Sequence, residues 1–212
     1  MLPIRRPQDA PGGPVAPPWF PGLESPRLSI LPVQDRKGLV QAFELISIPE
    51  VGSGMEFPEK LSLRQFEIQF HRGPRKDIFL LLDRDSSQWA VLVIFWPLPG
   101  REGWHQILYG ILPEKRGRGL ALEGCRALLD AITRARLSNG MAAKVAVSNQ
   151  ASRKIARGLG MTLAPDPAGV WWEIPIGAAA LTLPQRLWSL VAWESVPRSL
   201  FQVAARIQRR LG

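Results

Sequence analysis

Cysteine and histidine are scarce in this chain. Its 212 residues include one cysteine, Cys125, and two histidines, His71 and His105. A single cysteine excludes an intrachain disulfide, and so few cysteines and histidines argue against a Cys/His metal site. We therefore predict that no metal is bound, that the protein resides in the reducing cytoplasm, and that Cys125 is a packing residue rather than a nucleophile.

Long apolar runs and acidic charge are also in short supply. The longest strongly apolar stretch without charge, residues 89–100, is too short and too broken by proline to cross a bilayer. Arg5 and Arg6 are followed by no apolar segment, which argues against a secretory signal. Lysine and arginine outnumber aspartate and glutamate by 27 to 18, a net charge of +9. A positively charged surface attracts anions. The positive charge is explained either by a nucleic-acid, ribosomal or anionic-membrane partner or by an ordinary solvated basic surface.

Proline and glycine divide the chain into three parts. Residues 1–24 are rich in both and lack periodicity, which predicts a disordered or polyproline tail. Residues 25–176 have the patterning of one globular domain. Residues 177–212 carry apolar positions at helical spacing on both sides of Pro197, with arginines off the apolar stripe. This basic helical extension is interpreted as packing on the domain, as pairing with a second copy in a homodimer, or as lying on an anionic membrane.

Strand and helix patterns are interspersed in the central part. We predict strands at residues 28–33, 78–82, 88–96, 104–109, 144–147 and 170–176. We predict helices at residues 34–48, 60–71, 120–136 and 149–159. The polar turn at 83–87 joins two apolar runs as an antiparallel hairpin. The fold class that follows is α/β with a mixed sheet.

The stretch from 107 to 132 carries the most chemical information. An apolar strand stops at Pro113, and an amphipathic helix starts at Leu120. Between them, Arg116 to Gly119 reads Arg-Gly-Arg-Gly, just where the first N–H groups of the helix lack partners. Together with the helix dipole and the arginines, these groups suit a pyrophosphate. The alternative is a basic surface turn, and the spacing fits neither the dinucleotide nor the P-loop pattern.

In this context the loop resembles the acetyl-CoA loop of the GNAT N-acetyltransferases, whose pattern Gln/Arg-x-x-Gly-x-Gly/Ala is met by Arg116, Gly119 and Ala121. Further matches resemble the branch that includes the ribosomal-protein N-terminal acetyltransferases. They are Tyr109, Pro113, Glu123, Asn149, Ser152, Leu159 and Gly160. The resemblance covers residues 25–176, in two ordered motifs.

This resemblance implies a mostly antiparallel sheet flanked by helices, acetyl-CoA as cosubstrate and an amine as acceptor. The residues it implies for acetyl-CoA binding are Ile111, Arg116, Gly117, Arg118, Gly119, Leu120, Ala121, Asn149 and Ser152. By the same resemblance, Asn149 contacts the pantetheine arm and Ser152 hydrogen-bonds the thiolate. Asn149 is equally well interpreted as a helix N-cap.

Two family positions for proton transfer are changed. Ala156 stands where many GNAT enzymes have a tyrosine acid, and Lys144 lies near where many have a glutamate. Ser152 is then the remaining candidate acid. The base is unassigned, with His105 and Glu102 the nearest candidates, and we predict Ser152 and His105 as catalytic residues.

The leading functional hypothesis is an acetyl-CoA-dependent N-acetyltransferase that acts on a protein or peptide amine. A small-molecule amine is the second acceptor class. The changes at Ala156 and Lys144, with the net charge of +9, motivate a third hypothesis, a non-catalytic acyl-CoA-binding or nucleic-acid-interacting module.

Overall fold

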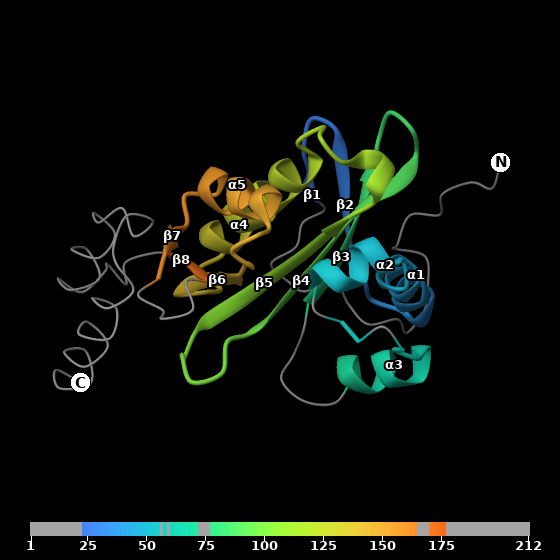
Figure 1. The fold of residues 1–212 in the computed structure, drawn as a ribbon, viewed down its shortest axis with the longest axis horizontal. Coiled ribbons are helices and arrows are strands. Elements are labelled where there is room, and N and C mark those ends of the chain that lie inside the picture. Colours follow the sequence, from blue (N-terminus) through green and yellow to red (C-terminus); the bar gives the residue numbers. More distant parts are fainter. Residues whose placement is uncertain (1–22, 56, 59, 72–76, 165–169, 177–212) are drawn as a thin grey trace, which may run out of the picture.

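A continuous β-sheet runs through the part of the chain that the computed structural model describes, residues 23–55, 57–58, 60–71, 77–164 and 170–176 (Figure 1). Its eight strands are arranged in the order β1-β2-β3-β4-β5-β6-β8-β7. All neighbouring strands are antiparallel except β5 and β6, which are parallel. The strands are β1 (Leu23–Glu24), β2 (Leu28–Pro32), β3 (Asp77–Asp83), β4 (Gln88–Pro97), β5 (Trp104–Ile111), β6 (Gly140–Lys144), β7 (Thr162–Leu163) and β8 (Trp171–Pro175).

Helices cover both faces of this sheet (Figure 1). On one face lie α4 (Leu120–Arg134) and α5 (Gln150–Gly158), and on the other lie α1 (Arg36–Ile46), α2 (Pro49–Gly52) and α3 (Leu63–His71). Short 3-10 turns, η2 (Ser53–Met55) and η3 (Pro113–Lys115), follow α2 and β5. The predicted fold class, a mostly antiparallel sheet flanked by helices, is confirmed.

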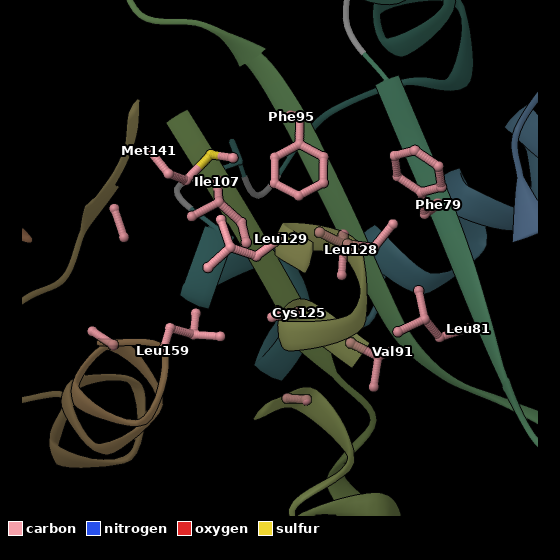
Figure 2. Packing of buried hydrophobic residues seen from close by; sticks show 14 of the residues in the cluster. Phe79, Leu81, Val91, Phe95, Ile107, Cys125, Leu128, Leu129, Met141 and Leu159 are labelled. Atoms are coloured by element: carbon pink, nitrogen blue, oxygen red, sulfur yellow. The ribbon is translucent and has the colours of Figure 1, made fainter. Parts of the chain in front are cut away.

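Helix α4 forms the centre of the larger core, shown in Figure 2. Its apolar residues recur every three or four positions, so that Leu120, Cys125, Leu128 and Ile132 are all buried. Gly124 lets the helix approach the sheet closely, since a Cβ there would lie 2.1 Å from a methyl carbon of Leu81. The helix is therefore held firmly against the strands, with its first turns beside Leu28 of β2 and Leu81 of β3.

Cys125 confirms its predicted role as a packing residue. It has no exposed surface and lies in the core between α4 and the sheet (Figure 2). Burial raises the pKa of its thiol, so the thiolate is disfavoured. Among the described residues, no group of three or more histidine, cysteine, aspartate or glutamate side chains is arranged to hold a metal ion.

The opposite face of the sheet carries a second core under α1, α2 and α3. Asp35 caps α1, and Leu39, Ala42 and Ile46 face the strands at helical spacing. Pro49, which was expected to end one long helix, instead begins α2 at the first helical position, where a missing N–H costs nothing. This short helix places Glu50 close to the loop after β5.

Strand β6 differs most from its prediction. It was expected at residues 144–147, but it begins at Gly140 and ends at Lys144. Its first four residues are all buried, so no alternation marks them as a strand. Gly140 follows Asn139 in a pair that is typical of a turn, but it is a strand residue that makes room for Trp104, whose ring would lie 2.5 Å from an added Cβ.

The described residues can be compared with the predicted domain boundaries near both ends of the sequence. Leu23 and Glu24, assigned to the tail, form β1 and pair with β2. The rest of the tail and the extension at 177–212 lie outside the described residues, so the homodimer and membrane hypotheses stay predictions. No helix in the described ranges has the length and apolarity required to span a membrane.

Candidate functional site

The sheet opens between β5 and β6. Their parallel pairing covers only three residues of β5, Trp104 to Gln106, and ends where Gln106 faces Ala142. Beyond this point β6 stays paired with β8, and β5 stays paired with β4. The two central strands therefore diverge at the carboxyl end of β5.

The diverging part of β5 has an unused backbone edge. Leu112 donates to the Ala90 carbonyl of β4 at 3.0 Å, and residues along an antiparallel ladder alternate in the direction of their polar groups. The N–H and C=O groups of Tyr109 and Ile111 therefore point away from β4, toward the side that β6 has left. An extended chain with amide groups can pair with this edge as an added strand would.

The loop after β5 presents a row of backbone donors. Gly117 and Gly119 both have a φ of +76°, a left-handed conformation that glycine adopts without strain. Gly119 is the N-cap of α4, and it has no side chain to accept from the helix. The N–H groups of residues 117–122 make no hydrogen bond within the described part of the chain. The helix dipole adds positive potential at the same place.

The loop arginines are both attached to the protein. Arg116 donates from Nη2 to the carbonyl of Glu50 at 2.9 Å. Arg118 donates from Nη1 to the carboxylate of Asp83 at 2.7 Å, and its own carbonyl accepts from Arg27 at 2.8 Å. The predicted basic loop is present, but its guanidinium groups are oriented by partners that the motif did not reveal.

Glu123 anchors the first turn of α4 to the start of β2. Its carboxylate accepts from the Ser25 hydroxyl at 2.7 Å, the Arg27 N–H at 2.9 Å and Arg27 Nε at 2.7 Å. Burial alone would raise the pKa of Glu123, but these hydrogen bonds lower it below the ordinary value. Glu123 stood out as a motif residue, whereas Ser25 and Arg27 carried no signal of this role.

The N-terminus of α5 faces the same strand. Asn149 Oδ1 accepts from the backbone N–H of Ser152 at 3.0 Å, so its interpretation as an N-cap is confirmed. The side chain of Ser152 also interacts with the Tyr109 hydroxyl. Tyr109 donates its hydroxyl to the Ser152 carbonyl at 3.1 Å, and burial raises the pKa of Tyr109, which keeps the phenol protonated. The structure thus brings Tyr109 and Ser152 together beside the unpaired edge of β5.

His105 is placed differently. It belongs to the part of β5 that is paired with β6, and its Nδ1 lies 2.9 Å from the Ser138 hydroxyl. Burial lowers the pKa of His105, so the neutral ring is favoured. It is four strand residues from Tyr109, roughly 13 Å along the chain direction. The structure does not bring this predicted base to Ser152.

The altered family positions are also visible. Ala156 is completely buried in the core beneath α5, and Lys144 is exposed at the end of β6. Glu102, the other candidate base, lies exposed in the turn before β5, where its carbonyl accepts from Asn139.

These features fit coenzyme A as a ligand. The pantetheine arm is an extended chain with two amides, which the polar groups of Tyr109 and Ile111 can pair with. The pyrophosphate is an anion, which the unpaired N–H groups of residues 117–122 can bind. A Cβ added at Gly117 would meet no atom within 4 Å, so the space over the loop is open.

Comparison with known proteins places the chain in a family. The acetyltransferase (GNAT) domain family matches residues 27–162, more than half of the chain. No individually curated protein sequence matches it.

Several solved structures share the fold. RimL, a ribosomal L7/L12 alpha-N-protein acetyltransferase in complex with coenzyme A, is 18% identical, with a TM-score of 0.58 over 72% of this chain and 96% of that one. The spermidine N-acetyltransferase of Vibrio cholerae, in complex with CoA and spermine, is 17% identical, with a TM-score of 0.57 over 66% of this chain and 83% of that one. An acetyltransferase from Agrobacterium tumefaciens is 17% identical, with a TM-score of 0.58 over 73% of this chain and 94% of that one. The chain therefore belongs to the GNAT family of acetyltransferases, acyltransferases whose cosubstrate is acetyl-CoA.

Proposed function

We propose that this protein transfers an acetyl group from acetyl-CoA to an amine of a protein or peptide. The observation that carries the proposal is the row of unpaired N–H groups at residues 117–122, next to the unpaired backbone edge of β5. The pyrophosphate binds to the loop, at Arg116, Gly117, Arg118, Gly119, Leu120 and Ala121, mainly through backbone donors. The pantetheine arm pairs with Tyr109 and Ile111.

Ser152 is the proposed proton donor or hydrogen-bond donor to the leaving thiolate. Its side chain lies beside the Tyr109 hydroxyl, and Asn149 and Tyr109 hold its backbone from two sides. Bound acetyl-CoA supplies the acetyl thioester, and a hydroxyl near the sulfur stabilises the negative charge that develops there. The side-chain amide of Asn149 remains available to contact the arm, because only Oδ1 is used in the cap.

In this proposal the proton of the amine is removed through a water molecule, and no side chain acts as the general base. His105 is engaged with Ser138 at the closed end of β5, and Glu102 is in an exposed turn. A water molecule that relays the proton needs no side chain in direct contact with the amine. This removes His105 from the chemical step while leaving it a structural residue of the β5–β6 junction.

A protein or peptide acceptor is favoured by charge. The chain has a net charge of +9, which repels polyamines such as the spermine bound to the Vibrio cholerae structure. RimL, which has the same fold, acts on a ribosomal protein. The positive surface also suits an acceptor that is presented on nucleic acid or on a ribosome, where phosphates attract it.

An acceptor panel tests this proposal. The purified protein is incubated with radiolabelled acetyl-CoA and either a library of N-terminal peptides or spermidine and other small amines. We expect acetylation of peptide N-termini. Turnover of small amines alone would show that the acceptor is a small molecule and not a peptide. CoA binding without turnover of any amine would contradict the proposed activity.

A further inference from the structure

A buried charged cluster lies beneath the donor loop, and Arg118 is its one member that the proposed function also uses. Asp83, the last residue of β3, has no exposed surface. Its Oδ2 accepts from Arg118 Nη1 at 2.7 Å, from Lys115 Nζ at 3.1 Å and from the Ser86 hydroxyl at 3.0 Å. Lys115 also donates to Ser86 at 2.7 Å, and its side chain is only 7% exposed.

Such a cluster needs an explanation, because burying charges in a protein is costly. A buried carboxylate is tolerated when cations and hydrogen-bond donors compensate it. Here Oδ2 carries all of these contacts, while Oδ1 is buried without a hydrogen-bond partner in the described ranges. Burial alone would raise the pKa of Asp83, but the hydrogen bonds from Arg118, Lys115 and Ser86 lower it to about 2. The carboxylate is therefore ionised whenever the protein is folded near neutral pH.

The two cations that Asp83 holds are placed on either side of Gly117. Lys115 precedes it by two residues and ends the 3-10 turn, and Arg118 follows it directly. One carboxylate thus fixes both flanks of the left-handed turn that directs the loop N–H groups outward. Arg27 holds the same segment from the other side, through the carbonyl of Arg118.

We propose that Asp83 is a positioning residue for donor binding, which holds the loop in its anion-binding conformation through Lys115 and Arg118 without touching the ligand. In this arrangement Arg118 serves as a tether, and the backbone supplies the contacts to the phosphates. The inference rests on the proposed binding of the CoA pyrophosphate at this loop.

Direct binding of the pyrophosphate by Arg118 would change the CoA affinity of the Asp83 variant in the opposite direction. If its guanidinium bound the pyrophosphate directly, Asp83 would compete with the ligand for the same cation. Replacement of Asp83 by asparagine would then release Arg118 and tighten CoA binding. If Asp83 positions the loop, the same replacement weakens CoA binding, because the turn loses its anchor.

The test compares two ligands that differ at the phosphates. NMR titrations measure the dissociation constants of CoA and of S-acetylpantetheine, which has no pyrophosphate, for wild type, Asp83→Asn, Arg118→Gln and the double variant. We expect each single variant to weaken CoA binding about tenfold, as for loss of one charge-assisted hydrogen bond. The double variant should be no weaker than the worse single one, since both changes break the same contact. Binding of S-acetylpantetheine should be unchanged.

Three results would overturn the inference: tighter or unchanged CoA binding in folded Asp83→Asn, strictly additive effects in the double variant, or an equal loss for both ligands. If Asp83→Asn does not fold, Ser86→Ala is a milder change at the exposed end of the cluster. It should weaken CoA binding about threefold and spare S-acetylpantetheine, and equal CoA affinity to wild type would overturn the inference. If wild type binds S-acetylpantetheine but not CoA, or binds neither, the proposed function fails with it.

Discussion

Helices α1 and α4 begin on opposite faces of the sheet, and each has first-turn N–H groups that need acceptors. In α1 the chain supplies one itself, since Asp35 Oδ1 accepts from the Gly38 N–H at 2.7 Å. In α4 the N-cap is Gly119, which has no side chain and therefore supplies no side-chain acceptor. The N-terminus of α1 is thus stabilised internally, whereas that of α4 is open to a ligand.

The two termini show how one sequence separates folding from binding. Leu120 and Glu123 hold the start of α4 by burial and by hydrogen bonds to Ser25 and Arg27, so the helix needs no cap in order to form. The N–H groups of Gly117, Arg118 and Gly119 can then stay unpaired at little cost, because these residues are exposed. Helix α5 is intermediate, since Asn149 caps it while Ser152 on its first turn contacts Tyr109 beside the unpaired edge of β5.

The largest expected effect comes from closing the open terminus. Gly119→Glu puts a negative side chain at a φ of +76°, where the anion is proposed to bind, and should weaken CoA binding more than about 100-fold. Calorimetry measures the affinity. Gly100→Glu is the matched control, because Gly100 has a φ of +77° in the β4–β5 hairpin, away from the loop. Equal losses in both variants would mean that backbone strain alone explains the effect.

The next effect concerns the intermediate terminus, at α5. Ser152→Ala removes the hydroxyl proposed to act on the thiolate and should lower kcat about 100-fold, with little change in KM for acetyl-CoA. Steady-state kinetics with an acceptor found in the panel measures both constants. Ser148→Ala, at an exposed serine just before the N-cap, should leave both constants unchanged. An active Ser152→Ala enzyme would remove Ser152 from the chemistry.

A pH titration isolates the contribution that Asp83, the anchor of the loop before α4, makes to the stability of the fold. The pKa of Asp83 is lowered from its ordinary value of 3.8 to about 2, so its ionised form stabilises the folded state. This contribution is fully present above the ordinary value and is lost as the pH falls toward 2. The difference in free energy of unfolding between wild type and Asp83→Asn should be constant above about pH 5 and should shrink below about pH 4. Urea unfolding measures it, and a difference that grew at low pH would contradict the assignment.

The smallest effect is expected at the capped terminus of α1. Asp35→Ala removes the side-chain acceptor and should lower the free energy of unfolding by about 1 kcal/mol. CoA affinity should not change, because this cap is complete within the protein. A loss of CoA affinity beyond about twofold would show that the two faces of the sheet are coupled.

The donor side of the molecule was largely predictable from the sequence. An open helix terminus is indicated by Gly117 and Gly119 followed by an amphipathic helix, and this signal lies within one short stretch of sequence. Asn149 and Ser152 are likewise local signals, because capping acts within one turn. The partners that fix this geometry come from elsewhere in the chain: Asp83 is 35 residues from Arg118, and Ser25 is 98 residues from Glu123. Tertiary contacts of this kind leave no periodic trace.

The mistakes have physical causes of the same kind. His105 was considered a base because histidine titrates near neutral pH, but Ser138, 33 residues away, takes its Nδ1. The start of β6 was missed because residues 140–143 are buried on both faces and lack alternation. The face of the sheet under α1, α2 and α3 carries no comparable motif, since its side chains mostly fill a core. For this reason the acceptor has to be identified by an assay, whereas the binding of the acetyl-CoA donor can be argued from the structure.

The most direct test of the central claim is hydrogen exchange at the amides of residues 117–122, followed by NMR with and without ligand. We expect that CoA slows exchange of several of these N–H groups, that S-acetylpantetheine does not, and that the Gly38 amide in α1 is unaffected by either. Saturating CoA that left exchange at residues 117–122 unchanged would contradict the claim that the open terminus of α4 holds the pyrophosphate.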